Sequence, residues 1–159
     1  MKVGITGHQE RVGIDWLWVR EAIDAEFERI DDRIWGISSL AKGTDQVFAE
    51  AVLARGGHLI AVIPIVGYEQ FFDGDALSSY QSLFAKAKVV HLNYEGDAEE
   101  AFLKAGHYIA DHSDLLIAVW DGAPSKGLGG TADIVQHVQR QRIPWIHVNP
   151  LLKAVVRYV

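Results

Sequence analysis

The sequence predicts an α/β fold of the doubly wound type, in which helices cover both faces of a mostly parallel sheet of about six strands. Short apolar runs rich in β-branched residues alternate along the chain with amphipathic stretches. This alternation is typical of parallel strands joined by right-handed crossover helices. The 159 residues are enough to bury a sizeable core, so we expect a single domain over residues 1–159.

Six strands are predicted from apolar runs in which Val and Ile are frequent. The runs are KVGIT (2–6), IWGIS (34–38), HLIAVIP (58–64), KVVHLN (88–93), LLIAVW (115–120) and WIHVN (145–149). The final nine residues, LLKAVVRYV, are not assigned to an element. We expect them to pack on an edge of the sheet or on a partner chain.

Helices are predicted between these strands. Over residues 14–30, apolar residues recur at steps of three and four, which places them on one face of a helix. They are Trp16, Val19, Ile23, Phe27 and Ile30. Before the fourth helix, Asp97 and Glu100 have the spacing of a capping box. The other helices are predicted over residues 44–55, 77–87, 98–112 and 131–141.

Composition and charge limit the classes of function. With 49% hydrophobic and 23% charged residues, no apolar run approaches the roughly 20 residues of a membrane span. There is no cysteine, and the N-terminus does not resemble a secretory signal, so we expect a cytoplasmic protein without a membrane partner. The formal net charge of −6 argues against broad binding to nucleic acid, which depends on Lys and Arg.

Three junctions that follow predicted strands combine glycine with hydroxyl or amide side chains. They are TGHQER (6–11), SSLAKGTD (38–45) and WDGAPSKGLGGTAD (120–133). Ligands of doubly wound folds bind beyond the carboxyl ends of the strands, where these junctions lie. Glycine lets a ligand approach the backbone, and the polar side chains supply hydrogen bonds. The three loops therefore predict one binding crevice.

Two of these junctions lead directly into a predicted helix. The first N–H groups of a helix have no partner within it, and together with the helix dipole they attract phosphate. Thr131 and Thr44 add hydroxyl groups at the two helix starts, and Lys42 adds a positive charge. Such glycines also suit ordinary turns, but two loops of this kind at one end of a sheet favour a phosphate-bearing ligand. Neither loop matches the Walker or dinucleotide-binding motif, which argues against an ATPase or a dehydrogenase.

The predicted ligand-binding residues come from all three junctions. They are Thr6, Gly7, His8, Gln9, Ser39, Lys42, Gly43, Thr44, Asp45, Trp120, Asp121, Gly122, Gly127, Gly129, Gly130 and Thr131. Three of them have an alternative role. Asp121 contacts a ribose or caps its turn, Asp45 contacts a ribose or stabilises the first helical turn, and Trp120 stacks on a base or packs in the core. The segment 68–80 suits either a binding lid or an ordinary loop.

The same segments carry a resemblance to a known superfamily. VGITGHQ, GISSLAKGTDQVFAEAVL, HLIAVIPI and ADHSDLLIAVWDG, followed by GLGGTADIV, resemble the SLOG superfamily of Rossmann-like domains. This grouping joins DNA-processing protein A with the Lonely Guy proteins. The resemblance runs from Met1 to about Asn149 and is closest to small bacterial and sensor-type members. It implies a Rossmann-like fold, a nucleotide-derived small-molecule ligand held by the three loops, and a homo-oligomer.

The resemblance also bears on catalysis, because Lonely Guy members hydrolyse the N-glycosidic bond of nucleoside monophosphates. Their motif Pro-Gly-Gly-x-Gly-Thr-x-x-Glu places its glutamate at Ile134, and their arginine falls near Ala105, beside Lys104. Since both groups are absent, we expect binding or sensing rather than hydrolysis. The alternative is a nucleotide N-glycosidase that uses Asp133 or Asp121 as its carboxylate. A third interpretation is handling of single-stranded DNA, which the acidic balance disfavours.

A metal site is not predicted. His107 and Asp111 lie four residues apart on a predicted helix, a spacing that places two ligands on one face. Two ligands are too few for a site, and no third is evident. We therefore expect no metal and no cofactor besides the nucleotide-type ligand itself.

Overall fold

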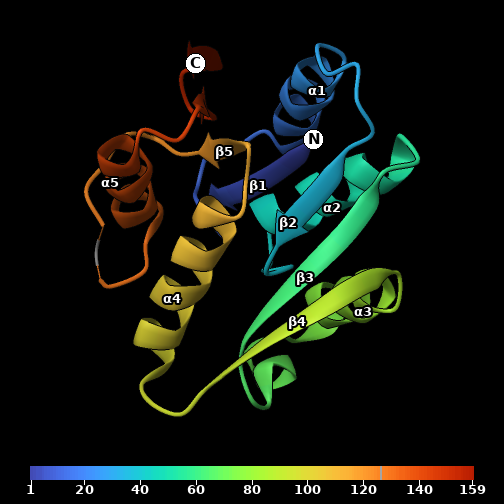
Figure 1. Cartoon of the computed structure of the whole chain (residues 1–159), viewed down its shortest axis with the longest axis vertical. Coiled ribbons are helices and arrows are strands. Elements are labelled where there is room, and N and C mark those ends of the chain that lie inside the picture. Colours follow the sequence, from blue (N-terminus) through green and yellow to red (C-terminus); the bar gives the residue numbers. More distant parts are fainter. Residues whose placement is uncertain (126) are drawn as a thin grey trace.

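In the described part of the chain, the sheet has seven strands, which are parallel except for the last. The computed structural model describes residues 1–125 and 127–159. The strands are β1 (Lys2–Gly7), β2 (Trp35–Ser38), β3 (His58–Ile65), β4 (Ala87–Tyr94), β5 (Leu115–Val119), β6 (Trp145–Asn149) and β7 (Ala154–Tyr158). Their order across the sheet is β4-β3-β2-β1-β5-β6-β7, so the predicted doubly wound, Rossmann-like fold is confirmed (Figure 1).

Helices cover both faces of this sheet. They are α1 (Trp16–Phe27), α2 (Thr44–Ala54), α3 (Gly74–Phe84), α4 (Ala98–Asp111) and α5 (Thr131–Gln141), and a short 3-10 helix, η1 (Tyr68–Phe71), precedes α3. On one face, Ile23 of α1 and Phe48 of α2 belong to a single core. On the other face, Ile109 of α4 and Ile134 of α5 belong to a second core. Successive residues of β5 alternate between the two cores, as the pleat of a strand requires.

The direction of winding reverses beside β1. From β1 the chain proceeds outward through β2 and β3 to β4, and it then returns through α4 to β5 on the other side of β1. Val3 of β1 is in register with Gly36 of β2 and with Leu115 of β5. Such a switch point leaves a crevice at the carboxyl ends of the strands, where folds of this type bind ligands. The loops after β1, β2 and β5 therefore meet at the carboxyl ends of the strands.

The C-terminal tail forms a seventh strand, one more than the six apolar runs predict, and it packs on an edge of the sheet as expected. β7 pairs antiparallel with β6 at the edge of the sheet, with Val148 opposite Val155. Arg157 of β7 donates a hydrogen bond of 2.8 Å from Nε to the carboxylate of Glu26, which is buried on α1. This contact joins residues that are far apart in the sequence, and no local pattern in the tail predicts it.

The first residues of the helices lie within a few residues of the predicted starts. Asp15 caps α1 by accepting a hydrogen bond of 3.1 Å from the N–H of Trp18. Asp97 caps α4 as predicted and accepts from the N–H of Glu99 at 2.7 Å. The second half of the predicted capping box is not formed, because the Glu100 carboxylate instead accepts a hydrogen bond from the hydroxyl group of Tyr94. Among the described residues, every helix is too short or too polar to cross a membrane.

Candidate functional site

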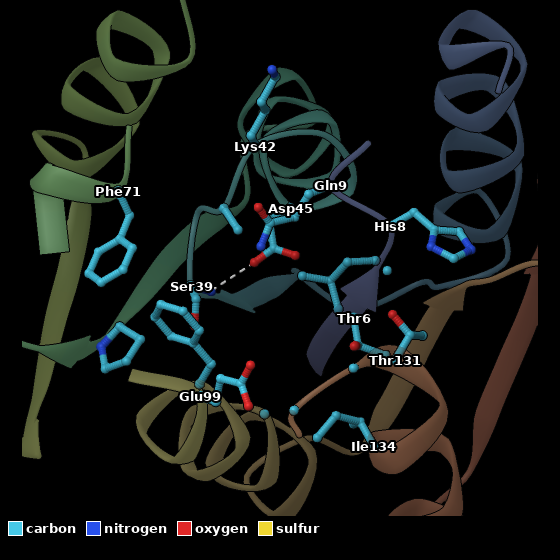
Figure 2. A pocket seen from close by; sticks show the side chains of 18 of the residues that line it. Thr6, His8, Gln9, Ser39, Lys42, Asp45, Phe71, Glu99, Thr131 and Ile134 are labelled. Carbon is cyan, nitrogen blue, oxygen red and sulfur yellow. Dashed lines mark hydrogen bonds between the residues drawn. The ribbon is translucent and has the colours of Figure 1, made fainter. Parts of the chain in front are cut away.

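A pocket of about 840 Å³ lies at the carboxyl ends of the strands (Figure 2). Its lining comes from the loops after β1 and β2, from η1 and the start of α3, from α4, and from the glycine-rich loop before α5. The predicted residues that line it are Thr6, Gly7, His8, Gln9, Ser39, Lys42, Asp45, Gly127, Gly129, Gly130 and Thr131. The structure therefore brings the three predicted loops together at one pocket.

The start of α5 faces this pocket. Thr131 is the first residue of the helix, and its side chain lines the pocket. In the described part of the chain, the N–H groups of Thr131 and Ala132 have no hydrogen-bond acceptor. They therefore direct unpaired donors and the positive end of the helix dipole towards the pocket.

The glycines before α5 bring the loop close to α4. Gly129 has a φ of +79°, and a Cβ at this position would lie 2.9 Å from the backbone nitrogen of Leu103. Both the backbone conformation and the close approach therefore require glycine. The N–H of Gly129 donates to the Asp133 carboxylate at 3.1 Å, which fixes the loop against the first turn of α5.

A further hydroxyl group lies beside the start of α5. Within the described residues, the Ser125 Oγ is buried without a hydrogen-bond partner. A Cβ added to Gly130 would lie 2.5 Å from this oxygen, so Ser125 packs directly against the residue that precedes the helix. Ser125 does not line the pocket, and its side chain supports the loop from behind.

At the start of α2, the second predicted phosphate site, the carbonyl oxygen of His8 occupies the donors of Thr44. The Thr44 hydroxyl group donates to the carbonyl oxygen of His8 at 2.8 Å, and the Thr44 N–H donates to the same oxygen at 3.2 Å. Gly43 has a φ of +81° and lies against the backbone of His8 and Gln9. Contrary to the sequence prediction, Gly43 and Thr44 do not line the pocket, and they hold the loop after β1 in place.

The two charged residues of this junction also have partners within the protein. The Lys42 ammonium group pairs with the carboxylate of Glu10. Asp45 is buried and accepts hydrogen bonds from the Ser38 hydroxyl group at 2.9 Å and the Ser39 N–H at 3.0 Å (Figure 2). Burial raises the pKa of Asp45 from 3.8 to about 6, and the hydrogen bond from Ser38 opposes this change. Asp45 thus shapes the loop after β2 as well as lining the pocket.

Trp120, Asp121 and Gly122 lie outside the pocket, contrary to the sequence prediction. Trp120 continues the alternation of β5 and packs against the core beneath α5, and its Nε1 donates to the carbonyl oxygen of Ala123 at 2.8 Å. The Asp121 carboxylate accepts a hydrogen bond of 2.9 Å from Nε of Arg11. Gly122 has a φ of +87°, so this junction is a tight turn in which Asp121 fixes the backbone.

The charge of Asp121 is stabilised by its neighbours. Burial raises the pKa of Asp121, but this effect is outweighed. Hydrogen bonds from the Ala123 N–H and from Arg11, together with nearby His8, hold the pKa below its ordinary value of 3.8. Asp121 is therefore an ionised residue that joins two loops.

The groups expected for glycoside hydrolysis are not in the pocket. Ile134, which stands where the glutamate is expected, lines the floor and is only 1% exposed. Ala105 is buried in the core beneath α4, and the Lys104 ammonium group lies over the Tyr94 ring, 5.0 Å from its centroid. Asp133 is hydrogen-bonded to the loop before α5 and does not contribute to the lining.

Residues that sequence analysis did not select close the other side of the pocket. Phe71 of η1 is 55% exposed, and Figure 2 shows its ring directed into the pocket. Its centroid lies 5.2 Å from that of Phe102 on α4, in an edge-to-face arrangement. The only sequence signal was the mixture of aromatic and polar residues in segment 68–80, which also suits an ordinary loop. Phe102 and Glu99 lie on an amphipathic helix, where nothing local marks a pocket residue.

The described lining of the pocket is acidic. Its carboxylates belong to Glu10, Asp45, Asp73 and Glu99. The one lysine among the described lining residues, Lys42, is already paired with Glu10. An anion in this pocket would therefore be held mainly by N–H and hydroxyl groups at the start of α5.

The residues weighed for a metal site contact one another in a different way. The His107 ring stacks on that of His137 with centroids 4.1 Å apart, and Nε2 of His137 lies 2.6 Å from the Asp111 carboxylate. In the ranges 1–125 and 127–159, no three His, Cys, Asp or Glu side chains are arranged to hold a metal ion.

Solved structures of other proteins have the same arrangement of helices and strands. DNA processing protein A from Streptococcus pneumoniae superposes with a TM-score of 0.66 and 21% identity over 93% of this chain. DNA processing protein A from Helicobacter pylori, described for its single-stranded DNA binding mode, superposes with a TM-score of 0.65 and 17% identity over 94% of this chain. The chain shares its fold with DNA processing protein A. It spans 50% and 65% of the length of these two relatives, respectively.

A third structure, the structural genomics target TM1055, has a TM-score of 0.56 and 13% identity and is covered over 71% of its length. The relation to DNA processing protein A that the sequence motifs imply is thus confirmed at the level of the fold. No protein-family model and no curated protein matches the sequence.

Proposed function

We propose that the protein binds a nucleotide or a nucleotide-derived small molecule, with a phosphate group at the start of α5 and a base against Phe71. One observation carries this proposal: a single pocket is lined both by Thr131, the first residue of α5, and by the exposed aromatic ring of Phe71. Helix starts bind phosphate, and an aromatic side chain that stacks on a base contributes roughly 1–3 kcal/mol. The pocket volume of about 840 Å³ lies within the range of small-molecule sites.

The acidic lining restricts the charge of the ligand. Glu99 and Asp73 line the pocket without a lysine or arginine partner among the described residues. Each additional phosphate group would bring more negative charge near these carboxylates, which is unfavourable in a partly enclosed site. The pocket therefore favours a ligand with few phosphate groups over a triphosphate.

Single-stranded DNA is a second candidate ligand, because a structural neighbour from Helicobacter pylori is described as binding it. Two properties of this chain weigh against it. The net charge is −6, and the described lining of the pocket is acidic. Affinity for a polyphosphate backbone depends on Lys and Arg, so we rank the small-molecule ligand first. Retention of single-stranded DNA that falls steeply with salt would reverse this order.

Turnover of the ligand is the remaining alternative. The two carboxylates considered for an N-glycosidase, Asp121 and Asp133, lie outside the pocket lining, and each is hydrogen-bonded to the backbone of its own loop. The floor position at Ile134 is apolar and cannot supply an acid or stabilise a cationic ribose. These contacts support binding without hydrolysis.

The experiment is thermal unfolding of the protein against nucleoside mono-, di- and triphosphates, NAD, ADP-ribose, cyclic nucleotides and an oligodeoxynucleotide. Each mixture is then analysed for breakdown of the ligand. We expect a nucleotide to raise the Tm and to be recovered intact, because a ligand that binds only the folded state stabilises it. Gly130→Val should abolish this shift, because its side chain would displace Ser125 and the loop before α5. Release of free base would establish the hydrolase instead.

A further inference from the structure

Glu99 occupies a position in the pocket between the two groups that the proposed function uses. Its N–H donates to the Asp97 carboxylate at 2.7 Å, which fixes it in the first turn of α4. A Cβ added to Gly127 would lie 3.4 Å from Oε1 of Glu99, so the carboxylate borders the glycine-rich loop. In Figure 2 Glu99 lies between Phe71 and Thr131.

The neighbour of Glu99 on the same face of α4 belongs to the aromatic side of the pocket. Phe102 follows Glu99 by three residues, and residues at this spacing are adjacent on a helix surface. Phe102 in turn contacts Phe71, with ring centroids 5.2 Å apart. Along the pocket, the order is therefore the loop before α5, then the carboxylate, then the aromatic rings. In a nucleotide the sugar likewise lies between the phosphate group and the base.

We propose that Glu99 determines specificity by accepting hydrogen bonds from the ribose hydroxyl groups of the ligand. This inference rests on the proposed function. An ionised carboxylate only accepts hydrogen bonds, and its two oxygens match the two donors of a vicinal diol. Within the described residues the Glu99 carboxylate has no hydrogen-bond or ion-pair partner, and its side chain is exposed to the pocket. The protein therefore prefers ribonucleotides to 2′-deoxyribonucleotides.

The preference for ribonucleotides follows from the free energy lost when a ligand removes water from the Glu99 carboxylate. When a ligand enters, it displaces water from Glu99 and must replace the lost hydrogen bonds. A ribose does so with its hydroxyl groups, whereas a deoxyribose leaves an acceptor incompletely paired. Hydrogen bonds to charged groups are among the stronger ones in proteins, so we expect roughly tenfold weaker binding of the deoxy form.

The test compares the four ribonucleoside 5′-monophosphates with their 2′-deoxy and 3′-deoxy forms by isothermal titration of wild type, Glu99→Gln and Glu100→Gln. Glu100→Gln is the matched control, because this adjacent carboxylate is hydrogen-bonded to Tyr94 and does not line the pocket. The ratio of the ribo to deoxy Kd is the readout. This ratio is insensitive to the loss of charge in Glu→Gln, because that loss alters the affinity for the ribonucleotide and for its deoxy form alike.

We expect a ratio of about ten in wild type and Glu100→Gln, and less than about three in Glu99→Gln. Equal binding of ribo and deoxy forms by wild type, with binding lost in Gly130→Val, would overturn this inference alone and leave the proposed function standing. A ratio that persists in Glu99→Gln would also overturn it. Absence of binding by every nucleotide, including those of the wider panel, would overturn both.

Discussion

The Thr44 hydroxyl group and the carbonyl oxygen of His8 form a hydrogen bond of 2.8 Å that joins the start of α2 to the loop after β1. Thr44 is fully buried, and a Cβ on Gly7 would lie 2.5 Å from its Cγ2. The loop that contributes Gly7, His8 and Gln9 to the pocket is therefore fixed by contacts within the protein. The start of α2 thus supports the loop after β1, which lines the pocket.

We predict that Thr44→Val lowers the free energy of unfolding by roughly 1 kcal/mol, because the His8 carbonyl loses one of its two donors. Thr44→Ser retains the hydroxyl group and serves as the control for this hydrogen bond. Urea unfolding of the three proteins measures the difference. Equal stability of Thr44→Val and wild type would show that the hydrogen bond contributes nothing to the fold.

Lys42→Ala tests whether the start of α2 takes part in binding. The Lys42 ammonium group is paired with Glu10, and the helix start behind it is closed. We therefore expect the nucleotide Kd of Lys42→Ala to change by less than about threefold, as for other exposed ion pairs. Titration calorimetry measures the constant. A tenfold loss of affinity would mean that Lys42 leaves Glu10 and contacts the phosphate group.

Phe71→Ala should weaken nucleotide binding by about tenfold or more without a comparable loss of stability. The ring is 55% exposed in the absence of ligand, and stacking on a base is worth roughly 1–3 kcal/mol. Tyr158→Ala is a suitable control, because Tyr158 is an exposed aromatic residue on β7 that does not line the pocket. If both variants bind the ligand as wild type does, the base lies elsewhere.

Asp45 predicts a dependence of stability on pH. Because burial raises its pKa to about 6 in the folded state, the folded protein binds this proton more tightly than the unfolded chain, where the pKa is near 3.8. The contribution to stability is complete below pH 3.8 and is lost as the pH rises through 6. The difference of about two pKa units corresponds to about 3 kcal/mol.

The measurement is urea unfolding of wild type, Asp45→Asn and the exposed control Asp32→Asn between pH 4 and 8. We expect wild type to lose stability relative to Asp45→Asn as the pH rises through this window, with no further relative loss above pH 7. Asp32→Asn should follow wild type throughout. A constant difference between wild type and Asp45→Asn would contradict the raised pKa.

The sheet and the part of the pocket formed by the predicted loops are predictable from the sequence because they depend on local patterns. Apolar runs locate β1 to β6, and glycine followed by a hydroxyl residue locates the start of α5. Trp120 and Asp121 are wrongly assigned to the pocket for a physical reason. The alternation of β5 directs Trp120 to the core, and Arg11 holds Asp121 against the loop after β1.

The remaining errors concern contacts between distant segments. The sequence pattern at Gly43 and Thr44 is that of a phosphate-binding helix start, and only the folded chain shows that the His8 carbonyl occupies it. Phe71, Glu99 and β7 were not selected, because their roles depend on which elements they meet. Phe71 meets α4 across the pocket, and β7 is joined to α1 through Arg157 and Glu26.

The most direct test of the central claim is a nitrogen-15 NMR titration that follows the backbone amides of Gly130, Thr131 and Ala132. A nucleoside 5′-monophosphate and the same nucleoside without its phosphate group are added in parallel. Our account predicts that the nucleotide shifts these three amide signals in a saturable manner and that the nucleoside leaves them unchanged. Saturable binding of the nucleotide with no change at these amides would place the phosphate elsewhere and contradict the account.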